Sequence, residues 1–332
     1  MGEFRRDPIT GRWVIIAAER ARRPRRLGSS NQQSETEPCP FCAGNETMTP
    51  PEVWAERADN GIENSPGWTV RVVPNKYPAL AADGEQSKII DRFYESQAGL
   101  GAHEVIIESP NHDVTLAGLN EDQFGRILRA YRARLRAVSQ DCRWRYALLY
   151  KNQGDYAGAT LEHIHSQLIA MPTVPQAAQE ELNWAKEHYQ ATGRCVYCAI
   201  IEREIRQRER LVFEHESFIA LCPFAPRFAY ETWLLPKAHS PEFMNSHDEV
   251  NGAFARALGE ILRRLQVALG DPPFNYFIHS MPLDDGAASH YHWQLRILPQ
   301  LARAAGFEWG SGAHINSVAP EAAAELLRDA LL

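Results

Sequence analysis

Two short cysteine motifs constrain this chain more than any other feature of its sequence. Cys39 and Cys42 form one Cys-x-x-Cys pair, and Cys195 and Cys198 form a second pair later in the chain. After each pair the residue pattern predicts strands, a histidine, a helix and a closing strand that carries histidines and a glutamine. A repeated order of this kind predicts two similar halves. We therefore expect an α+β fold of duplicated halves, each with an antiparallel sheet backed by helices.

The repeat is clearest where each half closes. The first half contains His163-Ile-His165-Ser-Gln167 and the second contains His290-Tyr-His292-Trp-Gln294, each followed by apolar residues and a proline. Apolar residues at helical spacing predict a helix ahead of each segment, within 124–138 and within 254–269. An internal duplication accounts for this shared order.

The length and charge of the chain limit what it can be. Its 332 residues are enough for roughly two domains, and we place the halves at 1–180 and 181–332. A formal charge of −7 leaves no broad basic surface for nucleic acid. The start of the chain lacks the apolar core of a signal peptide, and no apolar run is long enough to span a membrane. We therefore expect a cytoplasmic protein that binds neither nucleic acid nor membrane.

The cysteine pairs are better explained by metal binding than by disulfides. Disulfide frameworks are uncommon in a reducing cytoplasm, whereas two thiolates from one short turn are frequent zinc ligands. Histidines from elsewhere in the same half can complete a tetrahedral set. The pattern predicts two structural zinc ions per chain, the first held by Cys39, Cys42, His112 and His163, and the second by Cys195, Cys198, His239 and one of His290 or His292.

The segment around His165 has a second chemical use. Side chains alternate along a strand, so His163 and His165 are expected on the same face, where they can share one site. If His163 binds metal, His165 keeps a ring nitrogen that is a competent nucleophile toward phosphorus near neutral pH. Gln167 follows on that face, and its amide can donate to a phosphate oxygen. Taken alone, the pattern is compatible with either a metal-binding or a catalytic role.

The stretch before these histidines, 151–160, combines glycines with a hydroxyl group. Backbone amides in such a stretch can bind phosphate, although it lacks the Gly-Lys-Ser/Thr of a P-loop. It supports a phosphate site without establishing one. The remaining histidines, which include His103 and His279, are expected at surface or packing positions.

Together these motifs resemble the histidine-triad superfamily and, within it, the galactose-1-phosphate uridylyltransferase family, whose members carry two such halves in one chain. The likeness spans nearly the whole sequence. It rests on the segments 5–14, 21–24, 39–42, 72–78, 152–167, 234–239 and 292–295.

The resemblance implies a nucleotidyltransferase with a ping-pong reaction. A nucleotide sugar gives its nucleotidyl group to His165 and releases a sugar 1-phosphate, and a second phosphate then accepts the group. The resemblance also implies that Gln167 supports the phosphate, that Glu308 contacts the sugar, and that the first cysteine–histidine set binds zinc. Its implied nucleotide- and phosphate-contacting residues are Arg20, Asn75, Asn152, Gly158 and Thr160. Members of the family tend towards homodimers.

Several positions depart from the best-known uridylyltransferases. Ile164 and Ser166 stand where those enzymes have Pro and Gly, and the segment 296–298 lacks their second His-x-His metal motif. In these respects, and in its second cysteine pair, the chain is similar to the plant ADP-glucose phosphorylase branch, which accepts inorganic phosphate. That likeness, with Trp293 fixing the alignment, favours His292 over His290 as the zinc ligand.

Besides hydrolysis of a nucleotide sugar, in which water replaces the acceptor phosphate, three functions are compatible with this sequence. The leading one is transfer of a uridylyl group between UDP-glucose and galactose 1-phosphate. The second is adenylyl transfer from ADP-glucose to inorganic phosphate. The third is a zinc-stabilised nucleotide-binding protein without turnover, against which the intact His165 and Gln167 argue.

Overall fold

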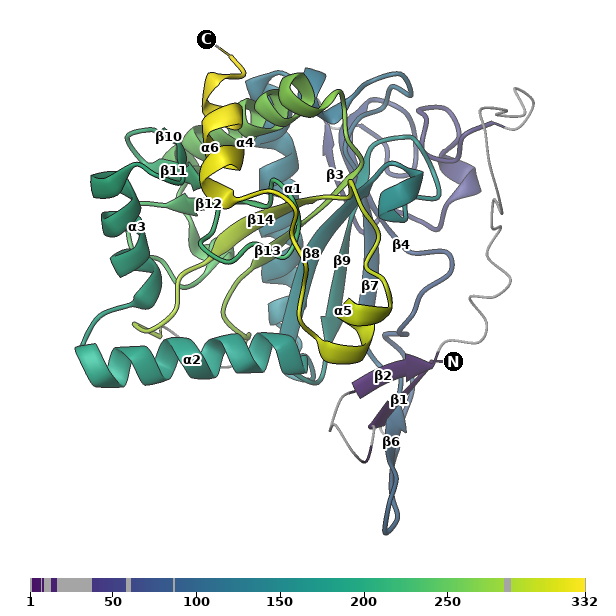
Figure 1. The fold of residues 1–332 in the computed structure, drawn as a ribbon. Helices are drawn as coiled ribbons and strands as arrows, with labels where there is room; N and C mark the ends of the chain where they lie inside the picture. Colours follow the sequence, from purple (N-terminus) through teal and green to yellow (C-terminus); the bar gives the residue numbers. More distant parts are fainter. Residues whose placement is uncertain are drawn as a thin grey trace.

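The centre of the molecule is a ten-stranded antiparallel sheet to which both halves contribute (Figure 1). The structure, a computed structural model, describes residues 2–6, 8, 13–16, 38–57, 61–85, 87–283 and 288–331. From the edge inward, the first half supplies β3 (Trp54–Arg57), β4 (Trp68–Pro74), β7 (Ala102–Ile107), β9 (His165–Met171) and β8 (Tyr146–Gln153). From the centre outward, the second half supplies β13 (Phe274–His279), β14 (Gln294–Pro299), β12 (Thr232–Pro236), β11 (Phe218–Leu221) and β10 (Leu211–Glu214).

The halves join in the middle of this sheet, where β8 pairs antiparallel with β13. The strand order on one side of the junction corresponds to the order on the other, as expected when two copies of one unit meet edge to edge. The predicted α+β class is confirmed, and the two expected sheets form one continuous sheet. Joining the β8 and β13 edges pairs backbone groups that two separate sheets would leave open. The predicted limit at 180/181 falls within α2 (Gln176–Thr192).

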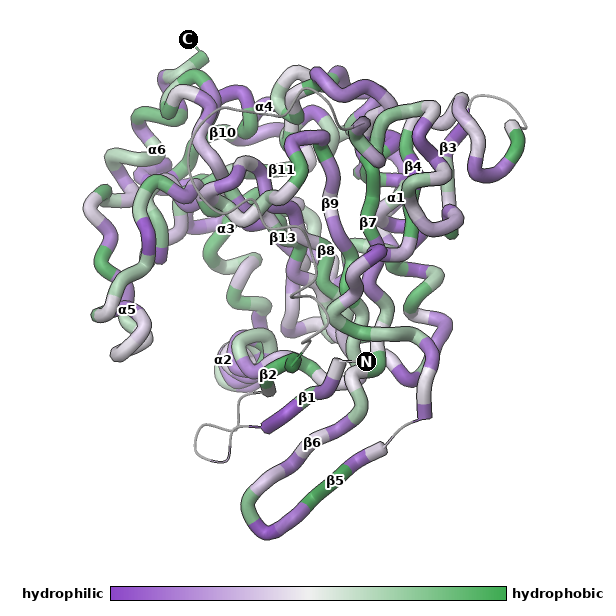
Figure 2. The backbone as a smooth tube through the Cα atoms, turned by 90° about the vertical axis from the view of Figure 1, so that its right-hand side faces the viewer, coloured by the Kyte–Doolittle hydropathy of each residue, from purple (hydrophilic) through white to green (hydrophobic). Residues whose placement is uncertain are grey.

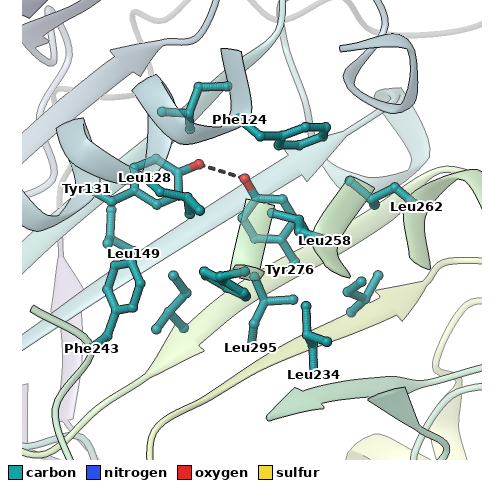
Figure 3. Close-up of a cluster of buried hydrophobic side chains, with 14 of the residues drawn as sticks. Phe124, Leu128, Tyr131, Leu149, Leu234, Phe243, Leu258, Leu262, Tyr276 and Leu295 are labelled. Carbon is teal, nitrogen blue, oxygen red and sulfur yellow. Dashed lines mark hydrogen bonds between the residues drawn. The ribbon is translucent and has the colours of Figure 1, made fainter. Parts of the chain in front are cut away.

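Helices α1 (Glu121–Ser139) and α4 (Asp248–Leu269) lie against each other over one face of the sheet. Asn120 caps α1 by accepting the backbone N–H of Gln123 at 2.9 Å. Both helices turn an apolar side toward the strands, and Figure 3 shows the resulting core with Phe124, Tyr131 and Tyr276 among its members. Each large apolar side chain buried in this layer contributes roughly 1.5–3 kcal/mol, so the helical layer is a main source of stability.

The opposite face of the sheet carries the first Cys-x-x-Cys loop. On β7, Ile106 packs in the helical core, whereas its neighbour Ile107 packs against Phe41 of that loop. The β7–β9 register places His165 opposite Ile107 and Ser166 opposite Ile106. Paired residues project from the same side of a sheet, so His165 faces the cysteine loop and Ser166 faces the helices.

The remaining elements surround this sheet. Helices α2 and α3 (Val196–Gln207) cover the second half on the face opposite α4, and α5 (Gly306–Ser311) and α6 (Pro320–Asp329) follow near the C-terminus. A separate four-stranded sheet extends from the body (Figures 1 and 2), in the order β2 (Trp13–Ile16), β1 (Glu3–Arg6), β6 (Glu95–Ala98) and β5 (Lys88–Ile90). Among the described residues, no helix is both long and apolar enough to cross a bilayer.

Candidate functional site

The four predicted metal ligands of the first half converge. Cys39, Cys42, His112 and His163 each place one ligand atom within 4.8 Å of the others. The Nδ1 atom of His163 lies 3.7 Å from the Cys39 sulfur and 3.6 Å from the Cys42 sulfur, which is 3.5 Å from His112 Nδ1. Sulfur and nitrogen ligands of a tetrahedral zinc ion are about 3.6 Å apart, because the bonds are about 2.3 and 2.0 Å long. The donor set and its spacing therefore fit a tetrahedral metal site.

A matching cluster forms in the second half. Cys195, Cys198, His239 and His292 meet the same distance criterion, and the Cys198 sulfur lies 3.4 Å from His239 Nδ1 and 3.6 Å from His292 Nδ1. His290, the alternative that the repeat in the sequence offers, is not a member of this cluster. The second half thus presents the same set of two sulfurs and two imidazoles as the first.

A backbone carbonyl orients the buried histidine of each cluster. His163 donates from Nε2 to the Ser109 carbonyl at 2.7 Å, and His292 donates from Nε2 to the Pro236 carbonyl at 2.9 Å. With the proton on Nε2, the Nδ1 lone pair faces the sulfurs, which is how metal-binding histidines are usually held. The strand expected from residue 163 starts instead at His165, and its counterpart starts at Gln294. His163 and His292 are therefore equivalent, each two residues before its strand.

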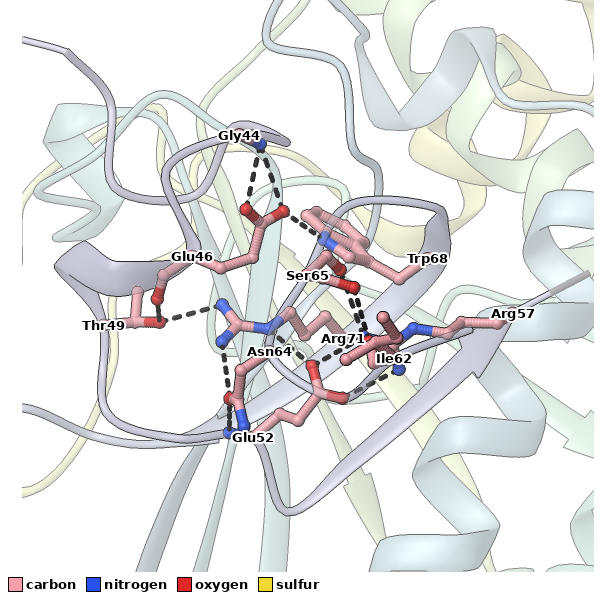
Figure 4. A network of polar contacts seen from close by, with 10 residues as sticks. All are labelled: Gly44, Glu46, Thr49, Glu52, Arg57, Ile62, Asn64, Ser65, Trp68 and Arg71. Carbon is pink, nitrogen blue, oxygen red and sulfur yellow. Dashed lines mark hydrogen bonds and ion pairs between the residues drawn. The ribbon is translucent and has the colours of Figure 1, made fainter. Parts of the chain in front are cut away.

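The loop that follows Cys42 is braced against β4 by buried polar contacts (Figure 4). The Glu46 carboxylate accepts from the Gly44 backbone at 3.1 Å and from the Trp68 indole at 2.8 Å. The Arg71 guanidinium, whose side chain is 1% exposed, binds the Glu52 carboxylate at 2.8 Å. Contacts to several partners fix the course of the loop, so the first cluster rests on a rigid support.

His165 lies beside the first cluster without joining it. Its Nδ1 donates to the His163 carbonyl at 2.8 Å, so Nε2 keeps its lone pair. The centroid of the Phe41 ring lies 5.2 Å from that of the His165 ring. Burial, assisted by the Lys151 charge, lowers the pKa of His165 to about 4. The imidazole is therefore neutral at pH 7, which is the nucleophilic form.

Three donors surround the side-chain carbonyl oxygen of Gln167. Its Oε1 accepts from His103 Nε2 at 2.9 Å, from the Tyr150 hydroxyl at 3.0 Å and from Asn75 Nδ2 at 3.4 Å. His103 can donate because its Nδ1 accepts the Ala79 backbone N–H at 3.0 Å. With Oε1 engaged, the NH₂ group of Gln167 is left to donate to a ligand beside His165. His103, expected at a surface or packing position, is thus a buried part of this site.

A glycine-bounded turn follows β8 next to His165. Tyr150 pairs with Gln167, so Asn152 lies two residues further along β8, on the same face as His165. Gly158, at the end of the turn, has a φ of +87°, a backbone conformation that favours glycine. Asn275 of β13 donates to Asn152 Oδ1 at 2.8 Å and to the Ala157 carbonyl at 2.9 Å. A second-half residue therefore holds the first-half turn in place.

The other residues predicted for ligand contacts are placed differently. Thr160 is exposed between this turn and His163. Glu308 lies on α5, where its carboxylate accepts from the backbone N–H groups of Ala305 at 2.9 Å and Ile315 at 3.4 Å. These contacts are local and do not bring Glu308 to His165. Arg20 lies outside the described residues.

The second half has no histidine at the position of His165. Gln294 starts its strand in that place, and Arg296 follows where Gln167 would be. Both donate to the carboxylate of Glu181 from α2, at 2.9 and 2.7 Å, and two tyrosine hydroxyls also donate to it. Burial opposes ionisation of Glu181, but the Arg296 charge outweighs it and lowers the pKa of Glu181 to about 2. An internal carboxylate therefore occupies this place in the second half.

Some residues of these two sites were not predicted from the sequence. His103, Tyr150, Asn275 and Glu181 reach their partners from other strands or from a helix, so no local spacing marks them. The alternation of side chains could have indicated that His103 and Tyr150 lie on strands of one sheet. It does not determine how these strands are in register with Gln167.

Family models match both parts of the chain. The model described as galactose-1-phosphate uridyl transferase, N-terminal domain, matches residues 2–175, and one described as a domain of unknown function (DUF4921) matches residues 100–332. ADP-glucose phosphorylase from Arabidopsis thaliana is 35% identical over 99% of this chain and 93% of its own length. Galactose-1-phosphate uridylyltransferase from Thermotoga maritima is 29% identical over 99% of this chain and 98% of its own length.

Solved structures show the same likeness in three dimensions. A crystal structure of an ADP-glucose phosphorylase from Arabidopsis thaliana with bound ADP-glucose matches with a TM-score of 0.77 at 34% identity, covering 99% of each chain. A structure of a uridylyltransferase matches with a TM-score of 0.82 at 29% identity, covering 99% of this chain and 98% of the other. The similarity therefore extends over both halves.

Proposed function

The chain belongs to the galactose-1-phosphate uridyl transferase family, and we propose from that premise that it transfers a nucleotidyl group from a nucleotide sugar to a phosphate acceptor. The arrangement of His165 supports this proposal most directly. Its imidazole is buried and neutral, its Nδ1 donates to the His163 carbonyl, and Gln167 follows two residues later on the same face of β9. A nucleophile and a donor to the phosphate are thus side by side on one strand.

The reaction follows from these contacts in two steps. In the first, the Nε2 lone pair of His165 attacks the α-phosphorus, a P–N bond forms, and the bond to the bridging oxygen breaks to release a sugar 1-phosphate. The His163 carbonyl accepts a hydrogen bond from Nδ1–H and stabilises the positive ring, while the Gln167 NH₂ group donates to a non-bridging oxygen. In the second step an acceptor phosphate oxygen attacks, the P–N bond breaks, and neutral His165 is restored.

The nucleotide is expected on the loop side of the sheet, beside His165. We infer that Asn75, Asn152, Gly158 and Thr160 border the nucleotide and its phosphates, because the first two lie around Gln167 and His165 and the others belong to the turn region. The corresponding roles of Arg20 on the nucleotide and Glu308 on the sugar rest on the family resemblance.

We propose that each cluster binds one zinc ion, giving two per chain. Two thiolates and two imidazoles in each half form a complete tetrahedral set, which is typical of structural zinc. Bound zinc would fix the local fold, and in the first half Cys39, Cys42, His112 and His163 would hold it. His163 also presents its carbonyl to His165, so the same residue links the metal site to the nucleophile. Elemental analysis close to two zinc per chain would support this assignment, and a value near zero would reject it.

Two pairs of nucleotide-sugar donor and phosphate acceptor are candidate substrates. UDP-glucose with galactose 1-phosphate is the pair named by the uridylyltransferase relatives. ADP-glucose with inorganic phosphate is the second candidate, favoured by the relative named ADP-glucose phosphorylase, which is the more similar of the two at 35% against 29% identity. Both pairs use the same histidine chemistry and differ in the base and in the acceptor.

A labelling experiment tests the mechanism and separates the candidates. The enzyme is incubated separately with UDP-glucose and ADP-glucose labelled at the α-phosphorus, denatured, and examined for acid-labile label on protein. We expect label from one donor, its loss in His165→Ala, and its removal by the matching acceptor, either galactose 1-phosphate or inorganic phosphate. Absence of label from both donors, or equal label in His165→Ala, would reject the covalent mechanism and favour a non-catalytic nucleotide-binding protein.

We further propose that the halves divide near residue 180. The protein is expected to work in the cytoplasm, where thiols stay reduced for metal binding. We also propose that the chain forms a homodimer. Light scattering coupled to size-exclusion chromatography tests the assembly. A monomeric mass across the working concentration range would contradict it.

A further inference from the structure

We propose that a buried polar network behind β9, formed by Glu108, Lys151 and Ser166 with Tyr131 and Tyr276, positions the nucleophile His165. The inference rests on the proposed nucleotidyl transfer and adds positioning residues to it. These five residues, called the β9 network below, lie on the face of the sheet opposite the metal cluster, because Ser166 projects toward the helices.

The centre of the β9 network is an ion pair without solvent contact. The side chains of Lys151 and Glu108 are both 0% exposed, and their charged atoms lie 2.5 Å apart. Lys151 Nζ also donates to the backbone carbonyl of His165 at 3.0 Å. The Ser166 hydroxyl donates to the second oxygen of the same carboxylate. The ion pair is thus bonded directly to the two residues that begin β9.

Two tyrosines connect this ion pair to the rest of the fold. The Tyr131 hydroxyl, from α1, donates to Glu108 at 2.7 Å and lies 2.6 Å from the Tyr276 hydroxyl of β13 (Figure 3). Tyr131 belongs to the helical layer, and Tyr276 belongs to the second half. The β9 network therefore ties the backbone at His165 to a helix and to the neighbouring strand of the other half.

His165 is consequently held from two sides. On the loop side, its Nδ1 donates to the His163 carbonyl, and on the helical side, its own carbonyl accepts from Lys151. The preceding residue is also fixed, since the Ile164 carbonyl accepts the Glu108 backbone N–H at 3.2 Å. With both neighbours and the carbonyl restrained, the ring has little freedom to move relative to the phosphate site.

Stability does not account for this arrangement. A buried ion pair loses so much hydration that apolar residues of similar size are often neutral or stabilising in its place. The second half shows this substitution within the same molecule. Leu295 occupies the position of Ser166, and Ile278, which pairs with it on β13, occupies the position of Lys151. Both are buried, at 0% and 2% exposure. In the second half, which has no histidine at the position of His165, apolar side chains therefore fill this layer.

The test replaces the ion pair by apolar groups and separates rate from affinity. We compare wild type with Glu108→Leu/Lys151→Met and with Ser166→Ala, using single-turnover labelling by whichever nucleotide sugar labels wild type. A matched control is Glu204→Leu/Arg210→Met, which removes a buried ion pair of the second half with side chains 4% and 5% exposed. Displacing a reacting group by about 1 Å can cost roughly 10²-fold in rate.

We expect the double variant to keep its fold and metal content while the rate constant of labelling falls by about 30-fold or more and the nucleotide-sugar Kd changes by less than about threefold. Ser166→Ala should lose about 3–10-fold in rate, and the control should stay within about twofold of wild type. A folded double variant with the wild-type rate, or one whose loss lies entirely in Kd, would overturn the proposal.

Two further readouts keep the proposal falsifiable. If the double variant does not fold, the labelling rates of Ser166→Ala and Tyr276→Phe test the proposal instead. Wild-type rates in both would overturn the proposal. The rate at which diethyl pyrocarbonate modifies His165, followed by mass spectrometry, should also change in the β9 network variants and not in the control. No label on wild type would reject the proposed function itself, whereas a labelled wild type with unaffected variants would reject only the positioning role.

Discussion

The two halves of this protein share a frame and differ in what they attach to it. Each carries a cysteine–histidine cluster whose buried histidine, His163 or His292, donates to a backbone carbonyl just before a strand begins. Beyond that point the first half presents His165 and Gln167, and the second presents Gln294 and Arg296. The shared frame therefore does not distinguish the halves. They differ in the two side chains that follow the frame on one strand, and we propose that His165 and Gln167 carry the chemistry.

In the second half, an acidic side chain of the chain itself lies against the residues that stand in the places of His165 and Gln167. Glu181 accepts hydrogen bonds from Gln294, Arg296, Tyr197 and Tyr291. In the first half, three groups donate to Gln167 Oε1, and we propose that its NH₂ group donates to a phosphate. In the second, the Gln294 amide and one NH₂ group of Arg296 donate to a carboxylate of the chain itself. We thus propose that one half binds an external anion, whereas the other places an internal carboxylate in the corresponding position.

The largest expected effect separates His165 from Gln294. His165→Ala removes the nucleophile, so we expect nucleotidyl transfer to fall by about 10⁴-fold or more. Gln294→Ala should leave the rate within about threefold of wild type, because its amide contacts Glu181 rather than the substrate. Steady-state turnover with the donor that labels the protein measures both. A comparable loss in the two variants would contradict the division between the halves.

The internal carboxylate should appear in the pH dependence of stability. The pKa of Glu181 is lowered to about 2, so its ionised form stabilises the fold above about pH 4.5, and this contribution is lost as the pH falls toward 2. We expect Glu181→Gln to lower the free energy of unfolding at pH 7 by about 3 kcal/mol, with the difference shrinking below about pH 4.5. Denaturant unfolding across this range measures it, with the exposed Glu202→Gln as a control. A pH-independent difference would show that ionisation of Glu181 is not the cause.

Removing the cysteines of the two clusters should have different effects on activity and stability. Cys39→Ser/Cys42→Ser removes the support of His163, whose carbonyl orients His165, so transfer should fall by roughly 10–100-fold. Cys195→Ser/Cys198→Ser should lower thermal stability and leave transfer by the folded protein within about threefold, since no residue of that cluster contacts His165. Zinc content should drop by one per chain in each variant. Equal losses of activity would mean that the clusters are functionally coupled.

The smallest expected effect tests how independent the first half is. Asn275 comes from the second half, yet it holds the turn beside His165 through Asn152 and Ala157. Asn275→Ala should weaken nucleotide-sugar binding about fivefold, the equivalent of about 1 kcal/mol for a lost hydrogen bond. Titration of the donor measures this, and Asn183→Ala on the exposed side of α2 serves as the control. An unchanged affinity would confine the site to the first half.

The sequence predicted those parts of the site that depend on short spacing and on the repeat. Two cysteines three positions apart can reach one ion whatever the rest of the fold, and the repeated order predicted histidine partners for each pair but left His290 and His292 open for the second. The resemblance to the plant branch favoured His292 over His290, and the structure places His292 in the cluster. The contacts of Gln167 were not predictable, because His103 and Tyr150 reach it only through the registers of β7 and β8 with β9.

By itself, the sequence predicted the class of the fold, two Cys-x-x-Cys pairs with candidate histidine partners, and the strand that carries His165 and Gln167, because periodicity, short spacing and the repeated order encode them. Only the tertiary structure decided that the halves share one sheet, that Glu181 pairs with Arg296 in the second half, and that Lys151 contacts the backbone of His165. Those features depend on strand register and helix packing between segments far apart in the chain. Shifting the pairing register of one strand by one residue would turn every side chain of that strand to the other face of the sheet.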